Sequence, residues 1–83
     1  MKFDTIKVKF VINIKDIVYI NSIIDSYEGI GIVRTIDPKE GLVAVYTNDF
    51  MKKYLYEVID ALKGEGYKID NISEEKTESV DNW

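Results

Sequence analysis

The sequence has 83 residues, with 11 lysine and arginine side chains against 15 aspartate and glutamate side chains and a formal net charge of −4. A chain of this length forms one small domain. The absence of cysteine and histidine excludes disulfides, thiol nucleophiles, the commonest general base and the commonest transition-metal ligand. Arg34 is the only arginine and no basic stretch is present, which argues against a nucleic-acid partner.

The N-terminal residues alternate in polarity and do not form the continuous apolar segment of a signal peptide. No later apolar run approaches the ~20 residues that cross a bilayer. Cysteine-free chains show no adaptation to an oxidising compartment. We therefore expect a soluble, cytoplasmic protein without a targeting segment or a membrane partner.

Alternating apolar residues define the first predicted element. From Thr5 to Ile14 every second side chain is apolar, which predicts a half-buried β-strand. The next segment has isoleucines at helical spacing, with Asp16 placed to cap the helix and Glu28 and Gly29 placed to end it. The predicted apolar face of this helix consists of Ile17, Ile20, Ile23, Ile24 and Tyr27.

Residues 30–37 and 42–47 are predicted to form a β-hairpin. Both segments are rich in β-branched residues, and the sequence Asp-Pro-Lys-Glu-Gly between them favours a tight turn. Proline presets φ in such a turn, and glycine accepts a positive φ. If residues 38–41 form the loop, Arg34 lies opposite Val45 and Val33 lies opposite Tyr46. Arg34 then shares the more apolar face of the hairpin, which we expect to lie beneath the helices.

Residues 49–63 have the apolar spacing of a second amphipathic helix, with Thr47 or Asn48 as its cap. A short edge strand is predicted from Tyr67 to Ile72. Residues 73–83 carry four carboxylates against one lysine and few apolar side chains, which is typical of a disordered acidic tail. The predicted division is a domain at residues 1–72 followed by this tail, whose Trp83 is either a docking anchor or part of a disordered end.

The predicted element order is β, α, β, β, α, β. Right-handed crossovers fold this order into an α+β, ferredoxin-like βαββαβ sandwich. In this arrangement both helices cover one face of a four-stranded antiparallel sheet of strand order 4-1-3-2. The first and third strands then occupy the centre of the sheet.

Residues 25–41, with the sequence DSYEGIGIVRTIDPKEG, resemble the uncharacterised prokaryotic family called domain of unknown function 4911. The matching features are a Ser-Tyr-Glu-Gly helix end, an apolar strand, a threonine and Asp-Pro-x-x-Gly before another strand. The resemblance extends over residues 5–72 and implies no activity, because this family has none assigned. The topology is more distantly similar to ACT domains, which bind amino acids at subunit interfaces. The loop of residues 13–16 lacks the Gly and Pro found at the corresponding ACT position.

Arg34, Asp25 and Glu28 form the predicted polar site. Asp25 and Glu28 lie in the last turn of the first predicted helix, where carboxylates oppose the helix dipole and gain from a nearby cation. One interpretation is a structural salt bridge, and the other is a clamp in which Arg34 binds a carboxylate or phosphate. Two carboxylates without a dedicated acidic loop do not define a metal site, so no metal or cofactor is predicted.

The sheet face opposite the helices is the predicted interface. An apolar centre with a polar rim favours a dimer that packs face to face or edge to edge. Self-association also suits a domain with so small a core. The interface residues predicted from the hairpin register are Val11, Val33, Leu42, Ala44 and Tyr46.

The function predicted from the sequence is a non-enzymatic, self-associating binding or assembly module, either as a homo-oligomer or with a protein partner. No catalytic residue is predicted, because no readable motif places a base beside Ser22 or Ser26. The alternative is an ACT-like regulatory domain that binds a small anionic metabolite or amino acid at a subunit interface near Arg34.

Overall fold

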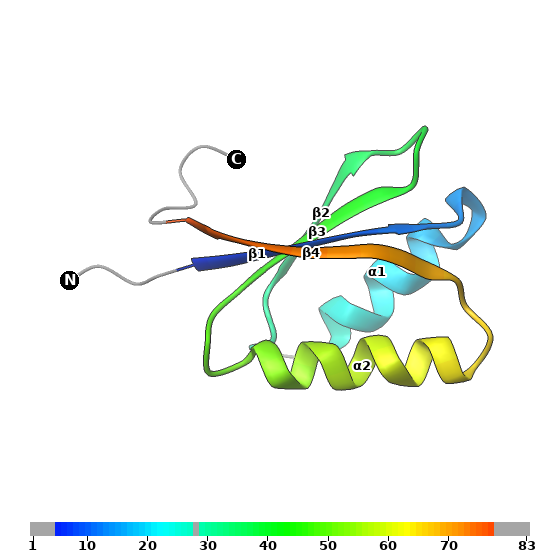
Figure 1. Ribbon diagram of the computed structural model, residues 1–83. Helices are drawn as coiled ribbons and strands as arrows, with labels where there is room; N and C mark the ends of the chain where they lie inside the picture. Colours follow the sequence, from blue (N-terminus) through cyan, green and yellow to red (C-terminus); the bar gives the residue numbers. More distant parts are fainter. Residues whose placement is uncertain (1–4, 28, 78–83) are drawn as a thin grey trace.

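The computed structural model describes residues 5–27 and 29–77, and these form the predicted sequence of strands and helices (Figure 1). The elements in chain order are β1 (Thr5–Ile12), a 3₁₀ turn η1 (Ile14–Asp16), α1 (Ile17–Ser26), β2 (Ile32–Asp37), β3 (Leu42–Thr47), α2 (Lys52–Gly64) and β4 (Ile69–Thr77). None of the described helices is long and apolar enough to cross a membrane.

The four strands form one antiparallel sheet of order β2-β3-β1-β4, and both helices lie on the same side of it (Figure 1). The α+β class and the ferredoxin-like arrangement predicted from the sequence are therefore confirmed. Strand β1 lies inside the sheet, between β3 and β4, and every second residue of it, Ile6, Val8, Phe10 and Ile12, is buried under the helices. The residues between them are half-buried on the opposite face, which is called the open face below.

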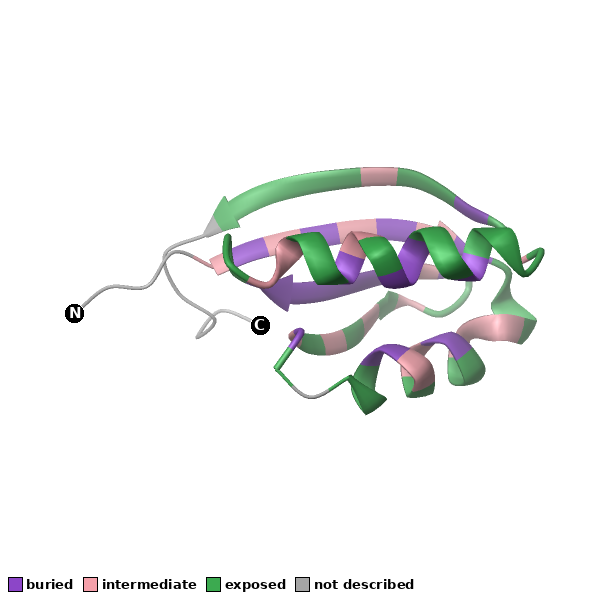
Figure 2. Cartoon of the chain, turned by 90° about the horizontal axis from the view of Figure 1, so that it is seen from below, coloured by how far each residue is buried: buried purple, intermediate pink, exposed green. Residues whose placement is uncertain are grey.

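The two helices bury one side each against the sheet (Figure 2). In α1 the fully buried residues are Ile20 and Ile24. Tyr27, predicted as part of the buried face, lies just beyond the helix in an extended conformation and remains 50% exposed. The predicted side-chain cap by Asp16 is wrong, because the turn η1 precedes α1 and only the backbone N–H of Asp16 is bound, to the carbonyl of Asn13 at 2.9 Å.

Helix α2 begins after a turn that Asn48 stabilises. The side-chain oxygen of Asn48 accepts a hydrogen bond from the N–H of Met51 at 2.8 Å, as expected of a capping residue. The hydroxyl of Thr47, the other predicted cap, instead donates to the carbonyl of Ile30 at 2.5 Å. The buried side of α2 consists of Leu55, Val58, Ile59 and Leu62.

The predicted register of the β2–β3 hairpin is wrong by one residue. Val33 lies opposite Val45 and Arg34 lies opposite Ala44. The cause is a bulge between Thr35 and Asp37, which adds a residue to β2 where simple pairing was assumed. Because side chains alternate along a strand, this shift exchanges the two faces of β2.

Strand β4 continues beyond its predicted end. The predicted strand end at Ile72 and the predicted disordered tail at residues 73–83 are wrong for residues 73–77, because β4 extends to Thr77. Charged residues can form a strand at the edge of a sheet, where their side chains reach solvent, and the low hydrophobicity of this segment did not reveal that possibility. Residues 78–83, including Trp83, lie outside the described part of the chain.

Two glycines allow segments to approach closely. Gly41 follows the hairpin turn with φ +73°, and a Cβ atom there would lie 1.9 Å from the carbonyl oxygen of Ile12. The N–H of Ile12 donates to the carbonyl of Gly41 at 2.9 Å, which ties the hairpin to the central strand. At Gly31 a Cβ atom would lie 2.4 Å from the carbonyl oxygen of Tyr46, so only glycine lets β2 begin at this point.

Candidate functional site: the open face of the sheet

The open face is divided into an apolar half and a polar half. The registers place its side chains in rows that cross the sheet from β2 to β4. One row is Ile32, Tyr46, Lys7 and Glu75; the next is Arg34, Ala44, Lys9 and Ser73; the third is Asp37, Leu42, Val11 and Asp70, beside the bulge at Ile36. The β2–β3 half therefore holds most of the apolar members, together with Arg34 and Asp37, and charged or hydroxyl side chains predominate on β1 and β4.

The apolar half combines covered and exposed surface. Ala44 and Tyr46 are buried even though they face away from the helices. The ammonium group of Lys7 lies 5.7 Å from the centre of the Tyr46 ring, a cation–π contact that covers part of the ring. On the neighbouring strand, Ile32 is 56% exposed and Ile36 is 41% exposed. The exposed apolar surface of this half therefore lies mainly on β2, the edge strand.

Arg34 lies on the exposed side of β2, between these two isoleucines. The expectation that it lies beneath the helices is wrong, because the bulge exchanges the faces of the strand. Within the described residues, Arg34 forms no ion pair. A guanidinium group cannot lose its charge, and solvent exposure supplies the hydration that it needs. Arg34 is thus a cation in the middle of an apolar edge.

Asp25, the predicted partner of Arg34, lies on the other side of the sheet. It lines a hollow of about 340 Å³ between α1 and β2, together with Asn21, Ser22, Val33 and Thr35. The amide of Asn21 donates to the hydroxyl of Thr35 at 3.0 Å in this hollow. The structure therefore does not bring Asp25 and Arg34 together. Glu28, the third predicted member, lies outside the described residues.

Four of the five predicted interface residues share the open face: Val11, Leu42, Ala44 and Tyr46. Val33 was placed with them wrongly, because it turns toward the helices and packs against the core. The residues that sequence reasoning missed are Ile32 and Ile36. Their alternation with Arg34 was visible in the sequence, but assigning the face required the bulge.

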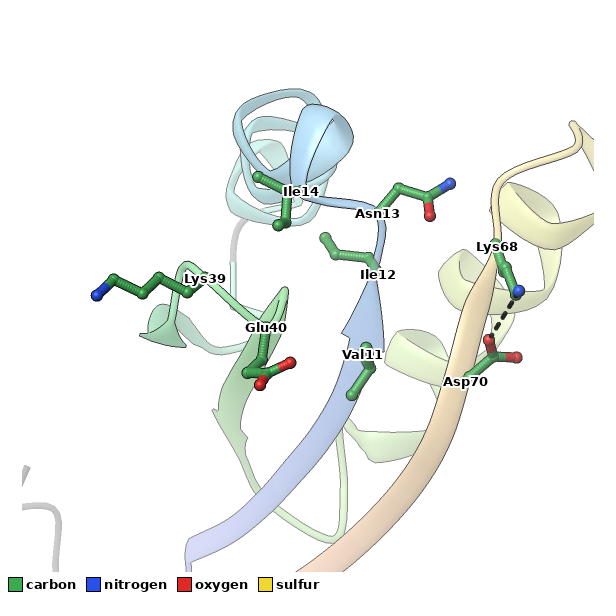
Figure 3. Close-up of a pocket in the computed structure, with 8 residues that line it drawn as sticks. All are labelled: Val11, Ile12, Asn13, Ile14, Lys39, Glu40, Lys68 and Asp70. Carbon is green, nitrogen blue, oxygen red and sulfur yellow. Dashed lines mark ion pairs between the residues drawn. The ribbon is translucent and has the colours of Figure 1, made fainter.

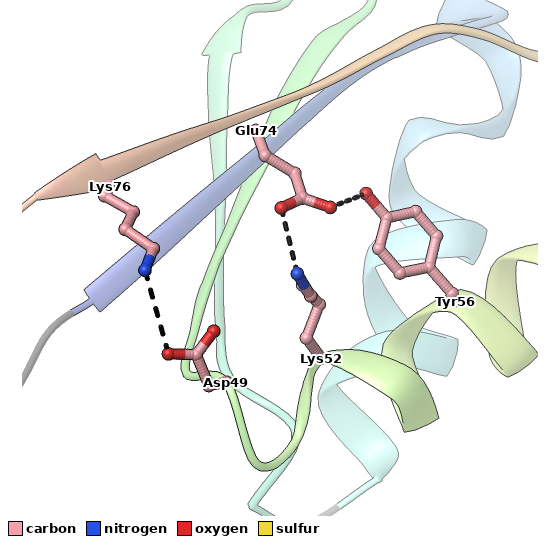
Figure 4. Close-up of polar contacts among 5 residues, drawn as sticks. All are labelled: Asp49, Lys52, Tyr56, Glu74 and Lys76. Carbon is pink, nitrogen blue, oxygen red and sulfur yellow. Dashed lines mark hydrogen bonds and ion pairs between the residues drawn. The ribbon is translucent and has the colours of Figure 1, made fainter.

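On the helix side of the sheet, polar contacts hold β4 to α2 and to the turn before it (Figure 4). Glu74 accepts a hydrogen bond from the hydroxyl of Tyr56 at 2.6 Å and forms an ion pair with Lys52 at 3.1 Å. These bonds, that of Tyr56 first, lower the pKa of Glu74 below its ordinary value. Burial, followed by the bond to Glu74, raises the pKa of Tyr56 to about 12. Lys76 lies 4.0 Å from Asp49 beside them.

A second hollow lies at the end of the sheet where β1 leads into η1 (Figure 3). Its volume is about 360 Å³, and it is bounded by Val11, Ile12, Asn13, Ile14, Lys39, Glu40, Lys68 and Asp70. Lys68 and Asp70 pair at 3.9 Å on one wall, and Lys39 points outward from the turn (Figure 3). Arg34 and Asp25 are absent from its lining. No cluster of three or more acidic side chains suited to a metal ion occurs among residues 5–27 and 29–77.

The fold and this surface together define a small α+β domain whose most distinctive chemical feature is an exposed apolar edge. The chain belongs to the family described as Domain of unknown function (DUF4911), whose model matches residues 10–65. This confirms the resemblance seen at residues 25–41. No curated protein and no solved structure matches the chain.

Proposed function

We propose that the chain is a non-enzymatic module that associates with itself through the β2–β3 half of the open face. The observation that supports this proposal is the exposure of Ile32 and Ile36 on an edge strand, 56% and 41% respectively. Exposed apolar side chains with charged neighbours are typical of protein–protein contacts. The charged half of the same face limits the contact to one side of the sheet.

Burial of these two side chains supplies part of the driving force. Complete transfer of an isoleucine from water contributes ~1.5–3 kcal/mol, and side chains that are about half exposed retain about half of that gain. In a symmetric contact each residue contributes this free energy twice, because both copies present the same surface. The gain also supplements a core that is small in a domain of this length.

The experiment is sedimentation equilibrium over a range of chain concentrations, with Ile32→Glu compared with the unchanged chain. We expect association in the unchanged chain and at least ~10-fold weaker association in the variant, since a charge must then lose its hydration at the contact. Val18→Glu is the matched control, because Val18 is 79% exposed on α1 and places the same new charge on the helical side.

A chain that remains monomeric at high micromolar concentration contradicts the proposal. Equal weakening by Ile32→Glu and Val18→Glu also contradicts it, because the effect would then follow net charge and not the open face. Circular dichroism of each variant separates a loss of folding from a loss of association.

The exposure of Arg34 favours a second candidate function, the binding of a small anionic metabolite or amino acid at the contact between copies. A guanidinium group between two apolar side chains suits a carboxylate that also carries an apolar group. A ligand at a hundred times its dissociation constant adds ~2.7 kcal/mol to stability. Thermal-shift measurements with a panel of carboxylates test this function. Arg34→Met should abolish the shift, and the absence of any shift in the unchanged chain contradicts it.

A further inference from the structure

We propose that the second copy joins edge to edge, with its β2 pairing antiparallel to β2 of the first copy, so that the two sheets become one continuous sheet. This inference rests on the self-association proposed above and specifies its geometry.

The direction of the backbone groups follows from one hydrogen bond in the centre of the sheet. The N–H of Ile12 donates to the carbonyl of Gly41 across the pair formed by β1 and β3. Bonded and non-bonded pairs alternate along an antiparallel ladder. Residues at even distances from Gly41 on β3 therefore bond to β1. Ala44 and Tyr46, at odd distances, direct their N–H and C=O groups toward β2.

The same alternation continues into β2. Ile32 lies opposite Tyr46 and Arg34 lies opposite Ala44, so these two residues of β2 direct their backbone groups inward. Val33 and Thr35 then direct their N–H and C=O groups away from β3, to the edge of the sheet. Their side chains turn toward α1, where the hollow of about 340 Å³ separates the helix from the strand. The edge therefore presents pairing groups to an incoming strand.

The charges of β2 favour an antiparallel second copy as the occupant. Arg34 and Asp37 are the charged residues of the strand, at its middle and its end. Antiparallel pairing reverses one copy, so a register offset such as Thr35 opposite Thr35 brings each Arg34 toward the Asp37 end of the other copy. A register with the two arginines opposite each other is disfavoured, because like charges in cross-strand positions repel. Such pairing is also symmetric, so it closes as a dimer and leaves no free β2 edge.

Amide hydrogen exchange in the unchanged chain tests the pairing directly. The amides of Val33 and Thr35 should exchange slowly only at concentrations where the chain associates, with protection increasing at least ~10-fold between the dilute and concentrated samples. The amides of Ile32 and Arg34 are the matched controls, because they are bonded within the sheet and should be protected at both concentrations.

A proline substitution provides a second test. Thr35→Pro removes one outward N–H group, which an edge strand tolerates and a paired strand does not. We expect at least ~10-fold weaker association for Thr35→Pro than for Thr35→Val, which loses the same contact with Asn21 but keeps the N–H group. Because both variants lack the hydroxyl, the ratio of their association constants reports only the loss of the N–H group.

Three outcomes overturn the edge pairing, and they differ in whether the proposed self-association survives. Association without added protection of the Val33 and Thr35 amides overturns edge pairing and leaves face-to-face packing, so the proposed function survives. Equal association of Thr35→Pro and Thr35→Val likewise overturns edge pairing and leaves the proposed function intact. A strictly monomeric chain removes the proposed function and the edge pairing together.

Discussion

Strands β2 and β4 form the two edges of one sheet, yet they differ in almost every property that controls association. Strand β4 carries charged side chains along its length, several of them in ion pairs, and a bulge with Asn71 in the left-handed region at φ 56°. Strand β2 carries two exposed isoleucines and only two charged residues, Arg34 and Asp37, and it has no lysine. Edge strands are commonly protected by charge, bulges and irregular backbone.

The difference indicates that protection in this domain is selective. The bulge of β2 lies at its end, between Thr35 and Asp37, and leaves residues 32–35 regularly paired with β3. The register shift of β4 falls inside the strand, opposite the segment between Lys9 and Val11. A bulge at the end of a strand redirects side chains, whereas a bulge inside it also interrupts the row of backbone groups that another strand would use.

The largest expected effect comes from a substitution that strains the contact between the β2–β3 hairpin and β1. Gly41→Ala places a Cβ atom against the carbonyl of Ile12 at a residue with φ +73°. We expect a loss of at least ~2–3 kcal/mol in the free energy of unfolding, measured by urea denaturation. Gly64→Ala is the control, since no atom lies within 4 Å of its added Cβ, and it should be neutral or stabilising. Equal stability of the two variants would contradict the close approach.

A second change gives β2 the protection that β4 already has. Ile36→Lys places a charge on the apolar edge at a side chain that is 41% exposed, so the monomer should lose less than ~1 kcal/mol of stability. Association should weaken at least ~10-fold, because a lysine on an edge strand must be desolvated when another strand pairs with it. Sedimentation equilibrium of Ile36→Lys and of the unchanged chain measures this difference in association. Unchanged association would show that the contact lies elsewhere.

A third change loosens the β4 edge without exposing apolar surface. Tyr56→Phe removes the hydroxyl that donates to Glu74 at 2.6 Å, and we expect a loss of about 1 kcal/mol at neutral pH. The folded-state pKa of Tyr56 is raised to about 12, so its contribution is present below pH 10 and is lost as the pH rises from 10 toward 12. Denaturation of both chains across this range should show the difference shrinking. A constant difference would contradict the bond.

The smallest expected effect concerns the acid side of the same cluster. The pKa of Glu74 is lowered in the folded chain, so its contribution is present above its unfolded pKa and is lost as the pH falls through its folded pKa. Because the group is partly exposed, we expect Glu74→Gln to cost only about 0.5 kcal/mol near neutral pH. The two chains should converge in stability as Glu74 becomes protonated. A variant less stable by the same amount at every pH would show that the carboxylate charge is irrelevant.

The element order and the central strand were predictable because short-range patterns determine them. The alternation of Ile6, Val8, Phe10 and Ile12 identifies β1 as a half-buried strand, and the βαββαβ order with right-handed crossovers places it inside the sheet. The isoleucine spacing of α1 likewise identifies Ile20 and Ile24 as buried. These features need only local periodicity and a cap or turn residue at each end.

The candidate site was less predictable because it depends on how neighbouring strands pair. The faces on which Arg34 and Val33 lie follow from the bulge before Asp37, and no single residue type in the sequence predicts that bulge. The extension of β4 to Thr77 depends on partners from other elements, Lys52 and Tyr56 for Glu74 and Lys9 for Glu75. Composition alone placed these glutamates in a tail, since their contacts are distant in the chain.

The bulge between Thr35 and Asp37 also absorbs one residue of chain length. Without Ile36, Thr35 would still pair with Val43 and Asp37 with Leu42, so the ladder would become regular and Arg34 would stay opposite Ala44 on the open face. Loss of this one residue would therefore remove an exposed isoleucine from the edge of the sheet without exchanging the two faces of β2.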